Sequence, residues 1–270
     1  MDNGFKQTPL SPEAHATSFW SANRRRPALL IILVTGLVLF LIWLPGGARA
    51  SLWTALSAQR ELVVLLSLFA LVTLSLIWST GQRLDTRVFM LFNMRVYPVW
   101  LDRSMWLVTQ LGNMLAAFIA AFLLFILNYR RLAIEIIFGT LTLWLLVEII
   151  KALSDRDRPF LTLDKARVIG WREIGDSFPS GHTTQIFFLM TLFIHHFQFG
   201  MVETAALYAV AALVGFTRIY VGAHYPRDVI AGIVLGSVWG ILATLVDPYW
   251  LVLRFGGSHP QVAEANTPHP

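Results

Sequence analysis

Three short polar clusters interrupt an otherwise apolar sequence, and each lies at the end of a long apolar run. They are Lys151–Pro159 (KALSDRDRP), Pro179–His182 (PSGH) and Arg218–Asp228 (RIYVGAHYPRD). Helices that begin or end at one membrane face would bring the three clusters to the same depth. Together they supply a lysine, several arginines, two histidines and a carboxylate. These residue types are suited to binding a phosphate and attacking it.

The first cluster offers two cations, Lys151 and Arg158, with six residues between them. An arginine binds two phosphate oxygens with its planar fork, and a lysine adds a compact charge. The alternative is that both side chains snorkel to the membrane interface. Arg156 lies between them and is expected to be solvated or to neutralise Asp155 or Asp157.

The second cluster is typical of a helix start. Ser180 is a good N-cap and an apolar run follows it directly. The free N–H groups of such a terminus form an anion site, and Gly181 leaves room for close approach. His182 then lies in the first turn, beside whatever the terminus binds. The alternative is an ordinary capped helix with an interfacial histidine.

The third cluster has the most specific spacing, since Asp228 follows His224 by four residues and Arg218 precedes it by six. Pro226 is expected in the first turn of a helix. A carboxylate bonded to one imidazole nitrogen fixes the tautomer and leaves the other nitrogen as a nucleophile or base. The alternatives are a capping aspartate beside a structural histidine, or a metal site. The nearby lysine and arginines would repel a cation, so no metal is expected.

Residues near the clusters have weaker signals. Glu148 precedes Lys151 by three residues on the same helix face, which predicts an ion pair that orients the lysine. The charged loop between the first two clusters is expected to contact a head group or to be solvated, through Asp164, Lys165, Arg167 and Arg172.

The composition indicates an integral membrane protein. Of 270 residues, 56% are hydrophobic and 14% are charged, whereas soluble domains carry about 25% charged residues. There is no cysteine, which excludes disulfides and cysteine-ligated metals. The net charge of +5 favours anionic head groups or phosphate substrates over nucleic acid.

The apolar runs predict an all-α polytopic transmembrane helix bundle with six or seven spans and its active site at helix ends near one membrane face. Residues 83–106 are amphipathic and are expected to lie in the interface. The expected divisions are a polar tail (1–26), two additional runs with the interfacial segment (27–110), a catalytic core (111–250) and a second polar tail (251–270). The seven apolar runs are 28–44, 62–78, 111–127, 132–150, 183–199, 202–216 and 229–246.

The orientation signals conflict. Arg130-Arg131 in a short turn is expected to be cytoplasmic, which places the three clusters outside. Counting back through seven spans then places Arg24–Arg26 outside as well, against the positive-inside tendency. Either the first run does not cross fully, or these arginines are an exception. Ala48-Arg49-Ala50 after the first run also resembles a signal-peptide cleavage site, although the run is longer than a usual signal core.

The three clusters, in this order, resemble the signature motifs of the type 2 phosphatidic acid phosphatase superfamily, which also contains vanadium haloperoxidases. The matching patterns are Lys-x6-Arg-Pro from Lys151, Pro-Ser-Gly-His from Pro179 and Arg-x5-His-x3-Asp from Arg218. The resemblance covers about 111–246. The third motif usually begins Ser-Arg, and Thr217 stands in the serine position here.

The resemblance implies a lipid phosphatase that needs no metal or cofactor and acts in a bacterial plasma membrane, with its site on the extracytoplasmic side. Undecaprenyl diphosphate, phosphatidic acid and phosphatidylglycerol phosphate are the candidate substrates, and membrane lipids are the other expected partners. The alternatives are a lipid phosphotransferase and a non-catalytic phosphate or lipid transporter. Charges at helix ends rather than at midspan favour the enzyme.

The resemblance also assigns roles by motif position. His224 would attack phosphorus, oriented by Asp228, and would form a phosphohistidine. His182 would protonate the leaving oxygen. The phosphate oxygens would be bound by Lys151, Arg158, Ser180, Gly181 and Arg218.

Overall fold

The computed structural model describes residues 58–76 and 79–255, together with residues 35 and 39. The apolar run expected at 28–44, the arginine triplet and the signal-peptide alternative therefore lie almost wholly outside the described residues. The described chain contains helices and no strand, which confirms the predicted all-α class. The helices are α3 (Arg60–Ser75), α4 (Ser79–Asn93), α5 (Val99–Thr109), η2 (Gln110–Gly112), α6 (Met114–Ile126), α7 (Arg130–Ser154), α8 (Pro159–Thr162), α9 (Gly181–Phe197), α10 (Met201–Tyr220) and α11 (Pro226–Phe255).

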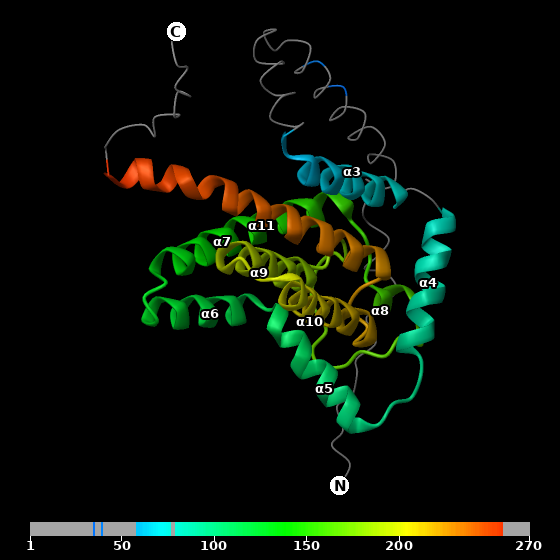
Figure 1. Ribbon diagram of the computed structural model, residues 1–270. Coiled ribbons are helices and arrows are strands. Elements are labelled where there is room, and N and C mark those ends of the chain that lie inside the picture. Colours follow the sequence, from blue (N-terminus) through cyan, green and yellow to red (C-terminus); the bar gives the residue numbers. More distant parts are fainter. Residues whose placement is uncertain (1–34, 36–38, 40–57, 77–78, 256–270) are drawn as a thin grey trace, which may run out of the picture. The chain divides into compact units, whose positions relative to one another are not determined.

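Helix α9 is the most buried element, and it packs most extensively against α11 (Figure 1). Three glycines of α11, spaced by four residues, allow this approach: a Cβ at Gly236 would lie 2.3 Å from the carbonyl oxygen of Thr184, and Gly232 and Gly240 are similarly close to α9. Small residues at such a spacing let helix backbones approach closely in membranes. The three glycines therefore bring the start of α9 next to the start of α11.

The ends of three helices carry the polar clusters. Helix α7 ends at Ser154, Asp155 then adopts a left-handed conformation, and Pro159 begins α8 after the four residues 155–158. Helix α10 ends at Tyr220, and Pro226 begins α11 as predicted. The chain reversals at these ends gather the clusters on one side of the helix pair α9–α11.

The structure divides the predicted interfacial segment 83–106 between α4 and α5. Asp85, Phe89 and Asn93, four residues apart, form a buried face of α4. The amphipathic pattern of α4 therefore reflects packing against the other helices as well as a solvent- or lipid-facing side.

Three described helical stretches are long and apolar enough to cross a membrane: Arg130–Thr162, Met201–Tyr220 and Pro226–Thr244. The number rises to five if α3 with α4, and α5 and η2 with α6, each count as one bent span. The predicted six or seven spans are thus not confirmed. Helix α6 has 13 residues, which extend about 20 Å, less than the hydrocarbon thickness of about 30 Å.

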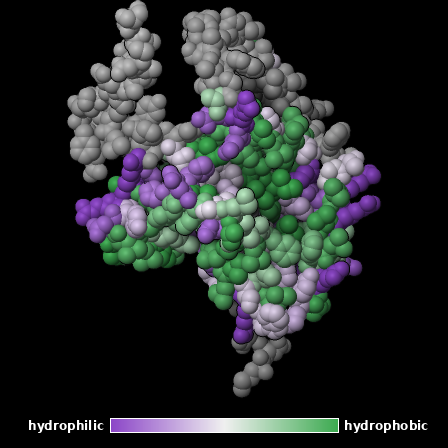
Figure 2. All heavy atoms as spheres, viewed as in Figure 1, coloured by the Kyte–Doolittle hydropathy of each residue, from purple (hydrophilic) through white to green (hydrophobic). Residues whose placement is uncertain are grey.

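Apolar side chains cover much of the surface, and Figure 2 shows them as a broad hydrophobic area on the visible face. Exposed residues of this kind line α6 and α7, where lipid chains are their natural surroundings: Leu115, Ile119, Phe122, Leu123, Phe138, Leu141 and Leu145. Together with the apolar helices, this surface identifies an integral membrane protein.

Candidate active site

Two buried arginines meet a single carboxylate at the ends of the helices. Arg158 is the residue directly before α8, and Arg218 lies in the last turn of α10. Both contact Glu173, which lies in the loop between α8 and α9. The Nη1 of Arg158 is 2.8 Å from Glu173 Oε2, and the Nη2 of Arg218 pairs with Glu173 Oε1. The structure thus brings together the two predicted phosphate-binding arginines.

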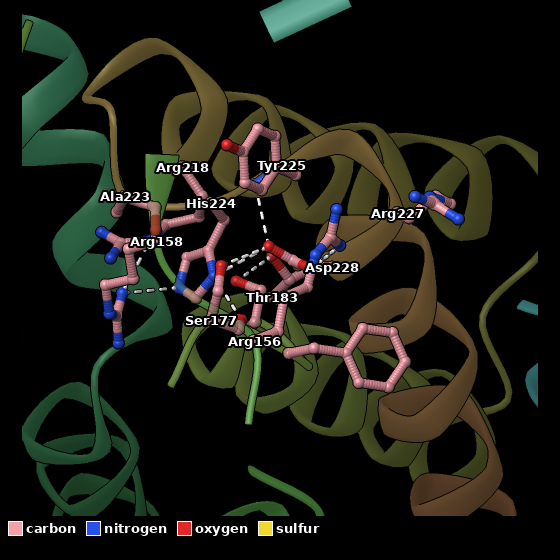
Figure 3. Close-up of polar contacts among 12 residues, drawn as sticks. Arg156, Arg158, Ser177, Thr183, Arg218, Ala223, His224, Tyr225, Arg227 and Asp228 are labelled. Atoms are coloured by element: carbon pink, nitrogen blue, oxygen red, sulfur yellow. Dashed lines mark hydrogen bonds and ion pairs between the residues drawn. The ribbon is translucent and has the colours of Figure 1, made fainter. Parts of the chain in front are cut away.

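The two histidines face the same carboxylate. His182 Nδ1 and His224 Nε2 each lie 3.8 Å from an oxygen of Glu173. The Nη1 of Arg158 is also 3.3 Å from His224 Nε2, a contact visible in Figure 3. Four predicted site residues from three helix ends therefore converge on one negatively charged group. Sequence reasoning missed Glu173 because it is one acidic residue in a charged loop, at no spacing typical of a partner for any of them.

One donor of Arg218 has no partner. Its Nη1 donates to Thr109 Oγ1 at 2.8 Å, at the end of α5. Within the described part of the chain, its buried Nε is without a hydrogen-bond partner. A buried donor in this state is costly, so the site retains an unsatisfied N–H beside the carboxylate of Glu173.

The orientation of His224 differs from the prediction. Its Nδ1 is 2.7 Å from the carbonyl oxygen of Ser177 and 3.7 Å from Asp228 Oδ2. The predicted direct hydrogen bond from the imidazole to the Asp228 carboxylate is therefore wrong, since 3.7 Å exceeds hydrogen-bond distance. Because a carbonyl oxygen only accepts, Nδ1 carries the proton and Nε2 keeps its lone pair.

Asp228 acts on this arrangement through Ser177 and the backbone (Figure 3). Its Oδ2 accepts from the hydroxyl of Ser177 and, at 2.8 Å, from the N–H of Tyr225. Its Oδ1 pairs with Arg156. The expectation that Arg156 is solvated is wrong, because this side chain is buried and pairs with the carboxylates of Asp85 in α4 and Asp228 in α11.

The start of α9 matches its predicted position, with Ser180 as N-cap. The Ser180 hydroxyl does not cap a backbone N–H, however, but accepts from Thr183 Oγ1 at 2.9 Å. The Ser180 N–H donates to the carbonyl oxygen of Asp228 at 3.0 Å, which ties α9 to α11. At Gly181, the nearest atom to an added Cβ would be 3.9 Å away, so this position is open as expected.

Lys151 lies near this group and not within it. Its Nζ is 2.8 Å from Glu148 Oε1, which confirms the predicted ion pair. Thr217 is buried, and its hydroxyl donates to the Val214 carbonyl within α10 at 2.6 Å. Its side-chain hydroxyl is thus used inside its own helix.

A cavity of about 490 Å³ opens beside the carboxylate. Its lining includes cations and other polar residues, Lys151, Arg158, Arg172, Glu148, Glu173, His182, Gln185 and Asn113. It also includes apolar residues, Met114, Leu143, Trp144, Val147, Trp171 and Ile174. The cavity therefore combines charges that suit an anion with apolar side chains that suit a hydrocarbon chain.

The charges determine the protonation of the loop residues. Burial alone would raise the pKa of Glu173, but the charges around it, that of Arg218 first and that of Arg158 as well, hold this pKa well below its usual range. Burial lowers the pKa of His224, and the charges of Arg158 and Arg218 lower it further. At neutral pH, Glu173 is therefore a carboxylate and His224 a neutral imidazole.

Among the described residues, no group of three or more acidic or histidine side chains is arranged to hold a metal ion.

A comparison with protein-family models matches residues 132–251 to the PAP2 superfamily. Residues 132–251 form a PAP2 superfamily domain. The domain begins in α7 and includes all eight predicted site residues. Helices α3 to α6 lie before the domain. One of them, α5, ends at Thr109, whose hydroxyl accepts a hydrogen bond from Arg218.

Known proteins resemble parts of this chain. A bacitracin transport permease protein of Bacillus licheniformis is 31% identical over 120 residues, which are 44% of this chain and 57% of that protein. An undecaprenyl-diphosphatase of Sulfolobus acidocaldarius is 29% identical over 134 residues, or 48% of this chain and 62% of that protein. The chain thus aligns with less than two thirds of the length of these two relatives.

The fold of the PAP2 domain is also found in a crystal structure. A transmembrane PAP2 type phosphatidylglycerolphosphate phosphatase from Bacillus subtilis superposes with a TM-score of 0.56 at 23% identity. The superposition covers 72% of this chain and 98% of the other. At this identity, the likeness concerns the arrangement of helices.

Proposed function

We propose that the protein is a membrane lipid phosphatase that removes a terminal phosphate from a lipid phosphate or diphosphate through a phosphohistidine. One observation carries the proposal: Arg158, Arg218, His182 and His224 all face the single carboxylate of Glu173. A group of cations and imidazoles around one anion is suited to a phosphoryl group, whose transfer is catalysed mainly by positioning and charge stabilisation.

In the first step, the substrate phosphate takes the place of the Glu173 carboxylate at Arg158 and Arg218. The unpartnered Nε–H of Arg218 is available to one phosphate oxygen. His224 attacks phosphorus with its Nε2 lone pair while its Nδ1 proton remains bonded to the Ser177 carbonyl. A P–N bond forms as the P–O bond to the lipid breaks. Burial and the charge of Arg218 hold the pKa of His182 at about 3 in the free protein, so His182 gains its acidic proton as the negatively charged phosphate binds beside it and then gives that proton to the leaving oxygen.

In the second step, water attacks the phosphohistidine and the P–N bond breaks. His182 takes a proton from this water, which returns the acid for the next turnover. Inorganic phosphate leaves, and His224 is again a neutral imidazole. The sum is one lipid phosphate and one water converted to one lipid alcohol, or lipid monophosphate, and one phosphate.

The cavity wall supports a lipid as the substrate. Its lining combines apolar residues such as Trp144 and Met114 with the cations Lys151 and Arg158. A phosphate bound between the arginines would place its attached chain along the apolar residues. Undecaprenyl diphosphate is the first substrate to test, since one relative is named an undecaprenyl-diphosphatase. Phosphatidic acid and phosphatidylglycerol phosphate are the others.

A transporter is the second candidate, because another relative is named a transport permease protein. We favour the enzyme for a geometric reason. A transporter needs to hold its anion without breaking a bond, whereas the His224 lone pair here is directed to the anion position and its other nitrogen is fixed. The extracytoplasmic side of a bacterial plasma membrane is the proposed location of the site.

The test measures inorganic phosphate released by purified protein in detergent, with excess chelator, from the three candidate lipids. Wild type should release phosphate, His224→Ala should not, and His195→Ala should match wild type. His195 is an exposed histidine at the opposite end of α9 and serves as the matched control. Binding of lipid phosphate without release would support a transporter. Phosphate appearing on a second lipid would support a transferase, and activity restored by added metal would contradict metal independence.

A further inference from the structure

Helix α4 lies outside the PAP2 domain, yet it places a buried carboxylate beside the active site. Asp85 is 2% exposed and belongs to the buried face of α4. Its Oδ2 accepts from Arg156 Nη2 at 2.5 Å and from Arg227 Nε at 2.6 Å. Its Oδ1 accepts from the backbone N–H of Arg227 at 3.1 Å. Asp85 therefore fixes the side chain of one arginine and both the side chain and backbone of the other.

The two arginines are close to the catalytic residues in sequence and in space. Arg156 lies two residues before Arg158, and Arg227 directly precedes Asp228. While Arg156 Nη2 is held by Asp85, its Nη1 pairs with Asp228 Oδ1. The guanidinium carbon lies 4.6 Å from the centre of the Tyr225 ring, which restricts its tilt. One guanidinium thus bridges a carboxylate of α4 and the carboxylate of the third motif.

Asp228 is connected to His224, the proposed nucleophile, through hydrogen bonds of Ser177 (Figure 3). Asp228 accepts from the Ser177 hydroxyl, and the Ser177 carbonyl accepts from His224 Nδ1. The Ser177 N–H in turn donates to the carbonyl of Arg156 at 2.7 Å. Ser177 is therefore held from two sides by the same arginine, once through the Arg156 backbone and once through Asp228. The position of Ser177 determines where the Nε2 of His224 is directed.

The buried charges of this network are balanced. Two carboxylates, Asp85 and Asp228, face two arginines, Arg156 and Arg227. If Asp85 becomes neutral, Asp228 is the charged partner that remains for Arg156, and the Nη2 end of the guanidinium retains the neutral Gln82 Oε1 at 3.0 Å. A guanidinium held by one carboxylate and one neutral amide is restrained less firmly than one held by two carboxylates, which would allow Asp228 and Ser177 to be displaced.

We propose that Asp85 is a positioning residue for phosphoryl transfer, which acts through Arg156 to hold Asp228, Ser177 and hence His224 in the attacking geometry. The inference rests on the proposed function. It implies that the catalytic unit extends beyond the PAP2 domain, because a helix that precedes the domain supplies part of the network that orients the nucleophile.

Asp102 provides a matched control. It is also an aspartate in a helix before the PAP2 domain, and it also pairs with an arginine, Arg167, through oxygens 2.6 and 2.8 Å away. It accepts a further bond from Tyr220 Oη at 2.7 Å. These bonds tie α5 to the loop and to α10 and do not lead to Asp228. Loss of the Asp102 charge should therefore affect stability and leave the orientation of His224 unchanged.

The test compares Asp85→Asn and Asp102→Asn in full-length protein purified in detergent. We measure kcat and KM for a lipid phosphate that wild type hydrolyses, together with the thermal unfolding midpoint. Asp85→Asn should lower kcat about 10- to 100-fold, the usual effect of removing a group that orients a catalytic one. KM should change less than about 3-fold, because Arg158 and Arg218 still bind the phosphate. Asp102→Asn should keep the wild-type kcat, and Asp85→Glu should give an intermediate one.

A double variant separates positioning from general destabilisation. If Asp85 acts through Asp228, then Asp85→Asn combined with Asp228→Asn should be no slower than Asp228→Asn alone. Multiplied rate losses would contradict the inference, as would a wild-type kcat in Asp85→Asn. If Asp85→Asn is not recovered folded, Asp85→Glu decides, and a wild-type kcat in that variant overturns the inference. A wild type that releases no phosphate from any lipid overturns the proposed function as well, whereas an active wild type with an unaffected Asp85→Asn overturns this inference alone.

Discussion

The carboxylate of Glu173 and a substrate phosphate would compete for the same two arginines, Arg158 and Arg218. We predict that Glu173→Gln binds inorganic phosphate more tightly, because a neutral amide makes weaker hydrogen bonds to a guanidinium than a carboxylate does. The inhibition constant for phosphate, measured as product inhibition, should fall roughly 10-fold, equivalent to about 1.4 kcal/mol. Asp164→Asn, which neutralises an exposed carboxylate of the same loop away from the cavity lining, is the control. An unchanged constant in Glu173→Gln would mean that the carboxylate does not occupy the phosphate position.

Glu173 should also make the stability of the folded protein depend on pH in the acidic range. Its pKa in the folded protein lies below the ordinary glutamate value, so the charged form stabilises the folded state. That contribution is fully present above the unfolded pKa of about 4.3 and is lost as pH falls through the folded pKa. The unfolding midpoint of wild type should therefore fall more steeply below about pH 4 than that of Glu173→Gln. Parallel curves for the two proteins would contradict the assignment.

Substitutions of the two histidines should give different results when the phosphoenzyme is trapped. His224→Ala should abolish both turnover and the covalent phosphoenzyme, because His224 Nε2 is the proposed nucleophile. His182→Ala should still form phosphoenzyme, and most readily with an activated aryl phosphate whose leaving group needs no proton. Acid quench followed by mapping of the labelled residue measures both outcomes. Label on His182, or phosphoenzyme in His224→Ala, would reverse the assignment.

The sequence predicted which residues meet but not all of their contacts. Arg158, Arg218, His182 and His224 belong to recognisable spacings at helix ends, and the structure brings them together. Residues outside such patterns, such as Asp85, Ser177 and Glu173, could not be found in this way. Asp85 lies 71 residues from Arg156 in sequence, and no spacing rule connects positions on different helices. The same limit explains why Asp228 was matched to its neighbour His224 and not to Ser177.

At the scale of helices, the polar clusters were located correctly at helix ends, because capping residues and apolar periodicity are local signals. The predicted number of spans is not confirmed, because it depends on how helices bend and end. Helix α5 and η2 meet α6 at an angle of 60°, with the break next to Gly112 and Asn113. An apolar run that ends at such a break is shorter than its composition indicates. The segment 83–106 was ambiguous for a related reason, since a buried polar face on α4 resembles a solvent-exposed one in sequence.

The close contact between α9 and α11 should determine how the starts of these two helices, and the site residues they carry, are placed relative to each other. A Cβ at Gly236 would lie 2.3 Å from the Thr184 backbone oxygen, which cannot rotate away. Gly236→Ala should therefore separate the two helices and lower stability by about 1–3 kcal/mol, the usual cost of overpacking. Activity should fall too, because the Ser180 N–H to Asp228 carbonyl bond joins the starts of these helices. Thermal unfolding in detergent measures the first effect, with the partly exposed Leu242→Ala as control; equal midpoints for the two variants would contradict the close contact.

At the scale of the whole molecule, the PAP2 domain at 132–251 holds the residues of the three motifs, while preceding helices complete their surroundings. Thr109 of α5 bonds Arg218, Asp85 of α4 bonds Arg156, and Asn93 of α4 donates to the carbonyls of Arg167 and Tyr220. These contacts come from three positions before the domain and reach both a predicted phosphate-binding arginine and the backbone near the third motif. The domain and the helices before it therefore form one functional unit in the described chain.

The direction in which this unit faces can be tested by labelling. Helix α7 has 25 residues and extends about 37 Å, enough to cross the hydrocarbon layer. Its start at Arg130 and the site loop after its end should then lie on opposite membrane faces. The basic turn before α7 is expected in the cytoplasm, so the site should be extracytoplasmic. The chain has no native cysteine, which gives a clean background.

We therefore predict that Ile174→Cys reacts with a membrane-impermeant maleimide in intact cells. Ile174 is 97% exposed in the loop that carries Glu173, so a label there needs no structural change. Arg130→Cys should react only after the cells are permeabilised, and phosphate release by both variants would show that they remain folded. Labelling of both in intact cells would mean that α7 does not cross the membrane. The reverse pattern would place the active site in the cytoplasm, where it would meet lipid phosphates of the inner leaflet instead of those exposed at the outer surface.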